Sequence, residues 1–286
     1  MTADQGAAPA APHVDLHSHS TASDGSQSPT AGVEAAHLAG LVALALTDHD
    51  TLAGIPEAQR AADAVGLRLV PGVELSVHQD TVEVHLLGLH IRDVSVMQDR
   101  LEVYRVRRVA RAAAIVEQLV TLGVPLTMEA VLAVAGAAAV GRPHVARALI
   151  AGGHVKDSRE AFDRYLGGGR PAYVPKERLE IGEGIALIHE AGGIAVIAHA
   201  GGDGRRERIE PLVPLGLDGL EVRHPSHSSE DASRLKALAD FFGLVPSGGS
   251  DWHGAMHGTR VLGAMKVPAE WLDAQDARVA QRRAGR

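Results

Sequence analysis

The chain has 286 residues and a formal net charge of −7, which argues against a protein that coats duplex DNA non-specifically. It contains no cysteine, so disulfides and thiolate metal sites are excluded, and any metal must be bound by His and carboxylate side chains. Hydrophobic residues make up 45% of the chain but aromatic residues only 3%, so we expect a sizeable aliphatic core. No apolar run is long enough to span a membrane.

The two ends of the chain differ in composition from the rest. Residues 1–12 are rich in Ala and Pro and lack the features of a signal peptide, so we expect a disordered leader and a cytoplasmic protein. Residues 271–286 are rich in Ala, Arg and Gln, and we interpret them as a loose tail or a frayed helix.

Short apolar runs alternate with helix-like segments in the first part of the chain. Strands are predicted at 14–16, 41–46, 67–70 and 81–91, with helices at 28–39 and 51–65. The same alternation returns as a helix at 181–191, strands at 194–198, 219–222 and 244–247, and a helix at 229–242. This order predicts an α/β fold with a parallel sheet or barrel and a site at the carboxyl ends of its strands.

Residues 95–170 break this pattern, because they contain almost no strand signal. Helices are predicted at 97–122, at 127–135, from 141 onward and at 158–166, so we interpret this segment as an all-helical insertion. The first of these helices carries a basic stripe. We expect a solvated helix face for its arginines, which are Arg105, Arg107, Arg108 and Arg111.

Nine side chains of metal-ligand type fall at or near the ends of the predicted strands. They are His17, His19, Asp24, His49, Glu74, His85, His199, Asp251 and His253. Because residues two apart in a strand share a face, His17 and His19 would point toward one place, and Ser18 would point away. Nine ligands exceed the needs of one ion and suit a cluster of two or three. Glu74 stands alone at its strand end, so it is the candidate bridging carboxylate.

These motifs resemble those of the PHP superfamily, named for polymerase and histidinol phosphatase domains. The resemblance rests on His17-Ser18-His19 with Asp24, Thr47-Asp48-His49, Gly72-Val73-Glu74, His199 and Ser250-Asp251-Trp252-His253. It implies a distorted (β/α)7 barrel formed by residues 13–94 and 171–270, with the insertion at 95–170 as a lid. It also implies a trinuclear metal site.

By the same resemblance, the nine residues divide into three sets. One ion would be bound by His17, His19, Glu74 and Asp251, a second by Glu74, His85 and His199, and a third by Asp24, His49 and His253. The first set would carry catalysis. Asp24 stands where some relatives have His, which favours a harder ion, so manganese is the leading candidate, with zinc, iron or magnesium as alternatives. Two to three ions per chain are expected. Asp15 and Asp48 are expected to orient neighbouring imidazoles.

A narrower resemblance concerns the insertion. The stretches 141–146, 162–166 and 171–174 look like the stand-alone branch typified by nucleoside 3′,5′-bisphosphate phosphatase and ribonuclease AM. It implies a phosphoesterase that hydrolyses nucleoside 3′,5′-bisphosphates, and also AMP, or trims short RNA from its 5′ end. Hydroxide held between the ions would be the nucleophile, since no nucleophile-elbow motif is present.

Five further residues are candidate substrate contacts. Arg142 and His144, at a predicted helix start, would bind a second phosphate with help from Lys176, or else cap the helix and carry surface charge. His224 and His227 flank a proline at a strand end. Each is a substrate contact, a general acid or a structural histidine.

Two other functions fit parts of this pattern. Histidinol-phosphate phosphatase would share the metal ligands, but the helical insertion with Arg142 and His144 argues against it. A non-catalytic PHP module supporting a polymerase would not need all nine ligand positions filled, and no polymerase segment is present. A nucleotide or short RNA is therefore the expected partner, without duplex DNA or membrane.

Overall fold

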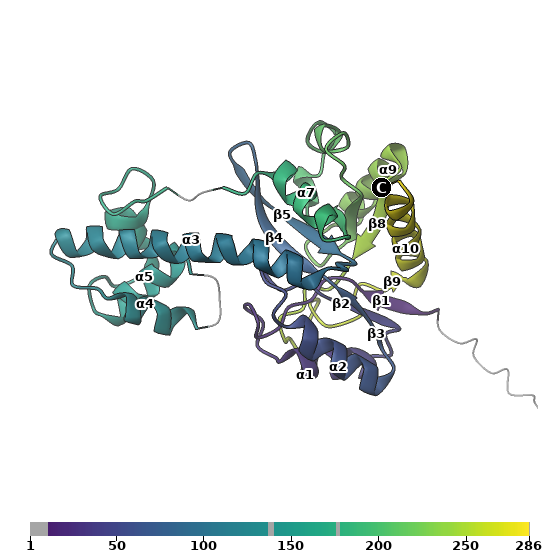
Figure 1. Cartoon of the computed structure of the whole chain (residues 1–286), viewed down its shortest axis with the longest axis horizontal. Coiled ribbons are helices and arrows are strands. Elements are labelled where there is room, and N and C mark those ends of the chain that lie inside the picture. Colours follow the sequence, from purple (N-terminus) through teal and green to yellow (C-terminus); the bar gives the residue numbers. More distant parts are fainter. Residues whose placement is uncertain (1–10, 137–139, 176–177, 286) are drawn as a thin grey trace, which may run out of the picture.

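The computed structural model describes residues 11–136, 140–175 and 178–285. The expected leader at 1–12 lies outside these ranges except for its last two residues, and Lys176 also lies outside them. An α/β body carries a helical arm (Figure 1), and the predicted α/β class is confirmed.

The strands and helices follow the predicted order closely. The strands are β1 (His13–Asp15), β2 (Ala43–Leu46), β3 (Arg68–Pro71), β4 (Val73–Gln79), β5 (Val82–Leu89), β6 (Ile194–Ile197), β7 (Gly219–Arg223), β8 (Val245–Gly248) and β9 (Val267–Pro268). The helices are α1 (Pro29–Leu38), α2 (Ile55–Val65), α3 (Val94–Thr121), α4 (Met128–Ala135), α5 (Arg142–Ala151), α6 (Ser158–Ala161), α7 (Ile181–Glu190), α8 (Arg206–Ile209), α9 (Ser229–Phe242) and α10 (Ala269–Ala284).

The described strands form two sheets and not one closed barrel. The first has the order β3-β2-β1-β9 and the second the order β4-β5-β6-β7-β8. The sheets meet beyond the ends of β1 and β2: the Leu16 amide, after β1, donates to the Gly248 carbonyl in β8 at 3.0 Å, and the Glu74 amide in β4 donates to the Asp48 carbonyl, after β2, at 3.2 Å. These meeting points are single bonds and isolated bridges, so the expected seven-stranded barrel is not continuously closed. The antiparallel hairpin β4–β5, which the sequence did not predict as a pair, also departs from a simple (β/α) repeat.

The two faces of the strands bury different side chains. Alternate residues such as Val14, Ala43, Leu87 and Val196 form one buried aliphatic cluster. Residues on the opposite face form a second cluster together with the surrounding helices. This alternation is the period-two pattern of a sheet buried on both faces, and it orients the strand ends that carry the polar site.

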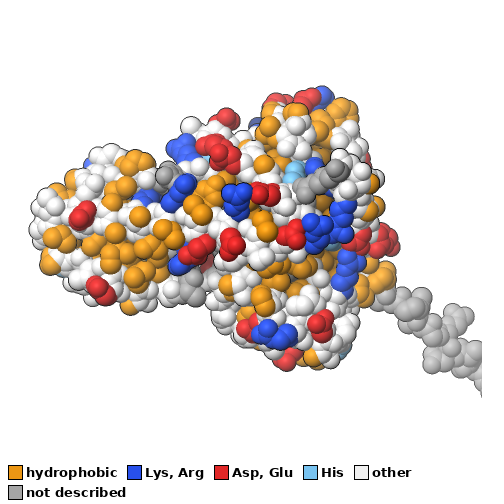
Figure 2. All heavy atoms as spheres, viewed as in Figure 1, with side chains coloured by type: hydrophobic (Ala, Val, Ile, Leu, Met, Phe, Trp, Pro, Cys, Tyr) orange, Lys and Arg blue, Asp and Glu red, His pale blue; other side chains and the backbone are white. Residues whose placement is uncertain are grey.

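The helical arm has a core of its own. It begins with the 28-residue helix α3, whose first turns pack on the body and whose remainder extends away from it (Figure 1). Helices α4 and α5 pack against α3, and α6 packs against α5. Their buried side chains, including Ile115, Val131 and Leu149, form a cluster separate from those of the body. Apolar side chains are also spread over the visible face of the arm (Figure 2), and Val106 and Val120 are 55% and 54% exposed.

The expectation of a loose tail at residues 271–286 is wrong for the described residues. Residues 271–284 belong to α10, whose Leu272 and Val279 are buried against the body. The Arg282 guanidinium donates to the buried Asp218 carboxylate at 2.5 Å, just before the start of β7. The alternative of a helix is correct, but the helix is packed and not frayed, and polar side chains such as Arg282 hold it through partners far away in the chain.

No helix among the described residues is long and apolar enough to cross a membrane.

Candidate metal centre

The chain that leaves β1 brings two histidines to the centre of the site. His17 and His19 are fully buried, and their ring centroids lie 5.2 Å apart. Ser18, between them, donates from Oγ to the Ala45 carbonyl at 2.6 Å and so points away. The alternation predicted from the sequence is confirmed. A glycine permits this packing, because a Cβ atom on Gly249 would lie 2.4 Å from the His17 Cβ.

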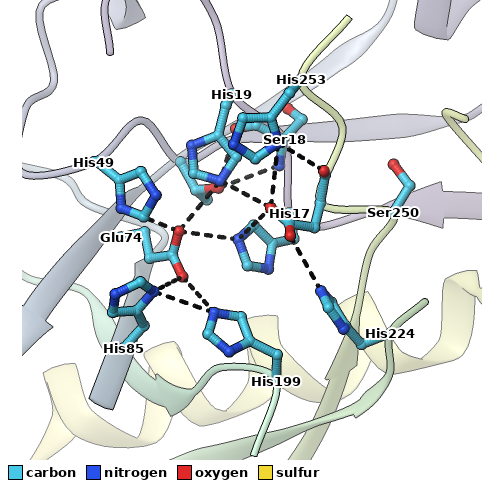
Figure 3. A network of polar contacts seen from close by, with 12 residues as sticks. His17, Ser18, His19, His49, Glu74, His85, His199, His224, Ser250 and His253 are labelled. Atoms are coloured by element: carbon cyan, nitrogen blue, oxygen red, sulfur yellow. Dashed lines mark hydrogen bonds and ion pairs between the residues drawn. The ribbon is translucent and has the colours of Figure 1, made fainter. Parts of the chain in front are cut away.

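Glu74 lies at the middle of the site (Figure 3), and its two carboxylate oxygens face different histidines. Oε1 lies 2.9 Å from His85 Nδ1 and 2.9 Å from His199 Nε2. Oε2 lies 3.2 Å from the Nε2 atoms of both His17 and His19, and 3.3 Å from His49 Nδ1. Burial alone would raise the pKa of Glu74, but the histidines around it lower this pKa well below its usual range. Glu74 is therefore an ionised carboxylate with both oxygens turned toward potential ligands.

Asp251 completes the buried group. Its Oδ1 lies 3.2 Å from His19 Nε2 and 3.5 Å from His17 Nε2. Its Oδ2 faces His224 Nε2 at 3.3 Å and also contacts the Arg260 guanidinium. The four residues of the first predicted set therefore surround one point. Each of His17, His19, Glu74 and Asp251 offers a ligand atom, and these atoms lie within 4.8 Å of one another.

The outer side of the site gathers around Asp24, which is about half exposed. Its carboxylate oxygens lie 3.3 Å from His253 Nε2, 3.8 Å from His49 Nε2 and 3.7 Å from His19 Nδ1. Burial would raise the pKa of Asp24, but the surrounding histidines lower it to about 2. The three residues of the third predicted set lie together here, and His19 joins them.

The donor atoms fit divalent metal ions. The Nε2 atom of His17 and both ring nitrogens of His19 are buried without a hydrogen-bond partner in the described structure. An unpaired buried polar atom is costly, so several such atoms facing ionised carboxylates indicate a place for cations. Imidazole and carboxylate are the ligands that Mn, Fe and Zn accept, and each Glu74 oxygen faces its own group of nitrogens.

Three residues at the site have left-handed backbone conformations, with φ of +26° at His199, +50° at Asp251 and +51° at Asp50. Such conformations cost free energy in residues other than glycine and cluster at functional sites. His199 and Asp251 are candidate ligands, and Asp50 follows the candidate ligand His49. The backbone is thus bent at the points where it presents side chains to the centre.

Asp15 and Asp48 do not orient imidazoles, contrary to the expectation from the sequence. Asp15 accepts hydrogen bonds from backbone amides, including that of Ser250 at 2.9 Å. Asp48 accepts from the amide and hydroxyl of Ser20, both at 2.7 Å, and from the Ser23 hydroxyl at 2.6 Å. Both carboxylates fix the loops that carry the ligands.

Glu221, which was not among the residues predicted from the sequence, orients an imidazole instead. It is fully buried in β7 and lies 2.9 Å from His17 Nδ1. Burial would raise its pKa, but His17 outweighs this effect and lowers it. The signal was an acidic residue inside the apolar strand 219–222, a position at which a carboxylate is costly unless it has a partner.

The predicted substrate residues lie in two places. Arg142 stacks against Phe162 and Tyr173, and its Nη1 donates to the Leu166 carbonyl at 3.0 Å. His144 Nδ1 accepts the Gly141 amide at 2.9 Å, as a capping residue does. Both residues lie in the arm, whereas Lys176 is outside the described residues.

His224 and His227 differ in their surroundings. His224 is buried beside the site, with its Nε2 facing Asp251 and its Nδ1 2.7 Å from the Ser226 hydroxyl. His227 uses both ring nitrogens on backbone groups, accepting from the Gly201 amide and donating to the Val222 carbonyl. The structure therefore brings only His224 into contact with a candidate ligand.

The arginines of α3 are not simply a solvated face. Arg108 donates to the Asp50 carboxylate at 2.5 Å. Arg111 donates to the Val174 carbonyl, and burial and the charges of Arg142 and Arg108 lower the pKa of Arg111.

A cavity of about 240 Å³ lies beside these arginines. Its lining includes Asp50, Ser76, Tyr104, Arg107, Arg108 and Arg111. A smaller cavity that shares Asp50 and Arg108 reaches His49, so this basic region adjoins the metal centre.

Comparisons with known proteins agree with this geometry. The family model of the PHP domain matches residues 15–124. The chain is 40% identical over 245 residues to a 5′-3′ exoribonuclease of Haemophilus influenzae, covering 84% of this chain and 89% of that protein. It is 36% identical over 258 residues to a 3′,5′-nucleoside bisphosphate phosphatase of Chromobacterium violaceum, covering 88% and 90%. A crystal structure from Bifidobacterium adolescentis, described as a metal-dependent phosphoesterase, matches with a TM-score of 0.74 and 34% identity over 95% and 98% of the two chains. The similarity spans body and arm alike.

Proposed function

We propose that this chain, which belongs to the PHP domain family, is a metal-dependent hydrolase of phosphate esters in nucleotides. The proposed substrates are nucleoside 3′,5′-bisphosphates and short RNA with a 5′-phosphate. The observation that carries the proposal is the Glu74 carboxylate, which turns one oxygen toward His85 and His199 and the other toward three further histidines. A bridging carboxylate of this kind suits a cluster of ions and not a single one.

The proposed cofactors are two to three divalent ions per chain, with manganese preferred. His17, His19, Glu74 and Asp251 would hold one, Glu74, His85 and His199 a second, and Asp24, His49 and His253 a third. Bound ions would offset the charge of a phosphate and lower the pKa of a water molecule in the site. The ligand side chains would hold the ions in fixed positions, and a phosphate bound there would be oriented for displacement.

Water is the proposed nucleophile. Ser18, the serine between two ligands, donates its hydroxyl to Ala45 and points away from the centre. Ser20 donates its hydroxyl to Asp48. Neither serine is turned toward a phosphate held by the ligands, so direct in-line displacement by water fits the described side chains.

The arm is proposed to act as the lid that selects the substrate. Its helix α3 brings Arg108 against Asp50, beside the candidate ligand His49. Arg107 and Arg111 line the adjoining cavity, and Arg142 is near enough to Arg111 to lower its pKa. Positive charges crowded in this way favour an anion between them. A second phosphate of the substrate would occupy this basic region while the first is hydrolysed at the metal centre.

The test is a phosphate-release screen with manganese. The substrates are adenosine 3′,5′-bisphosphate, AMP, short 5′-phosphorylated RNA and histidinol phosphate. We expect the bisphosphate and the RNA to be hydrolysed fastest, and a chelator to abolish activity until manganese is returned. Faster hydrolysis of histidinol phosphate, or full activity with the chelator present, would contradict the proposal.

A further inference from the structure

We infer that Glu221 is a positioning residue that holds His17 and His199 so that each presents its Nε2 atom to the metal centre. The inference deepens the metal binding proposed above and rests on it. Glu221 belongs to β7, and its carboxylate contacts His17 at Nδ1, whereas the Glu74 carboxylate faces the other ring nitrogen, Nε2. It is fully buried, and its ion-pair partner among the described residues is His17.

The first contact sets the proton position on His17. Glu221 Oε1 lies 2.9 Å from His17 Nδ1, and an ionised carboxylate only accepts hydrogen bonds. His17 must therefore carry its proton on Nδ1, which leaves the lone pair on Nε2. That Nε2 atom is the one buried without a hydrogen-bond partner, 3.2 Å from Glu74 Oε2. A carboxylate behind a histidine in this way fixes the ring and makes the other nitrogen a stronger ligand.

The second contact holds the backbone of His199. Glu221 Oε2 accepts the His199 amide at 2.7 Å. His199 has a φ of +26°, a conformation that non-glycine residues seldom adopt, so a buried acceptor for its amide stabilises a strained bend. The bend places His199 Nε2 at 2.9 Å from Glu74 Oε1. One carboxylate thus supports candidate ligands on both oxygens of Glu74.

A different role for Glu221 would be direct ligation. Oxygen and nitrogen atoms of His17, Glu221 and His224 lie within 4.8 Å of one another. Direct ligation would require His17 Nδ1 to face an ion, and it would make Glu221 essential for the number of ions bound. A positioning residue instead changes the affinity and leaves the number of ions at saturation unchanged.

The experiment compares Glu221→Gln with Asp218→Asn by titrating manganese into the metal-free proteins and measuring free ion by electron paramagnetic resonance. Gln keeps the shape of Glu but has only one acceptor oxygen for the two donors. Asp218 is a matched control, because it is equally buried next to the same strand but bonds to His189 and Arg282 and touches no candidate ligand. We expect Glu221→Gln to bind manganese roughly 10- to 100-fold more weakly with the same number of ions at saturation. Asp218→Asn should bind manganese like the wild type.

Three outcomes would overturn the inference: wild-type affinity in Glu221→Gln, an ion missing from Glu221→Gln at saturation, or equal weakening in Asp218→Asn.

A second measurement needs no variant. In wild-type protein loaded with zinc and labelled at histidine nitrogens, we expect His17 to be protonated at Nδ1 and coordinated through Nε2. Coordination through Nδ1 would contradict the inference. Neither measurement uses a substrate, so failure to hydrolyse nucleotides would leave both results interpretable.

Discussion

His19 shows how strongly a single residue depends on the charges around it. Burial alone would lower its pKa, but the carboxylates of Asp251 and Glu74, each 3.2 Å from its Nε2, outweigh this effect and raise the pKa to about 9 in the metal-free protein. The protonated ring then occupies the place of a cation between two carboxylates. Metal binding must displace this proton, since only the neutral ring is a ligand.

This shift predicts how the stability of the metal-free protein depends on pH. A raised histidine pKa contributes stability that is fully present below about pH 6.5. It is lost as the pH rises through about 9. We expect the thermal unfolding midpoint of the chelator-treated protein to fall over this interval, and His19→Gln to flatten that fall. His37→Gln, on the exposed side of α1, is the control. An identical fall in His19→Gln would show that His19 is not responsible.

At the scale of single elements, the surroundings of α3 differ from what its sequence indicated. The stripe of arginines looked like a solvated face, because helical spacing does not reveal what a helix meets when it crosses the body. The structure places Arg108 against Asp50 and next to a cavity that reaches the candidate ligand His49. The helix therefore connects the arm to the metal centre.

Arg108→Ala tests this role of α3. A lost charge-assisted contact costs about 1.5–3 kcal/mol, which corresponds to roughly ten- to a hundredfold. We expect kcat/KM for adenosine 3′,5′-bisphosphate to fall by that factor, with little change for an aryl phosphate that lacks a second phosphate. Arg100→Ala, an exposed position on the same helix that pairs with Glu190, should affect neither substrate. An equal loss on both substrates would indicate that Arg108 only supports the fold.

At the scale of the whole molecule, the two ends of the strands have different tasks. The carboxyl ends of β1, β2 and β6 lead into candidate ligands. Helix α10 packs instead at the amino ends of strands. There Arg282 donates to Asp218, just before β7, and Asp276 accepts from Arg68 at the start of β3. The described sheets meet through a few bonds beyond the carboxyl ends of β1 and β2. The site lies at these meeting points, since Glu74 pairs with His49 across one of them.

The sequence predicted the parts that local patterns determine. Apolar runs located most strands, and the alternation of His17 and His19 with Ser18 gave the direction of the ligands. Partners far apart in the chain carry no such local signal. For this reason the β4–β5 pairing, the packing of α10, the place of Arg108 and the support of His17 by Glu221 became clear only from the structure.

The most direct test of the central claim is the manganese content of wild-type protein and of Glu74→Gln, measured after saturation and removal of free ion. Glu74 turns one oxygen to each of two groups of histidines, so its loss should disturb more than one ion. Glu34→Gln, an exposed position on α1, is the matched control. The account predicts two to three ions in the wild type and in the control, and a loss of more than one ion in Glu74→Gln. Loss of a single ion, or of none, would contradict the bridging role on which the proposed chemistry rests.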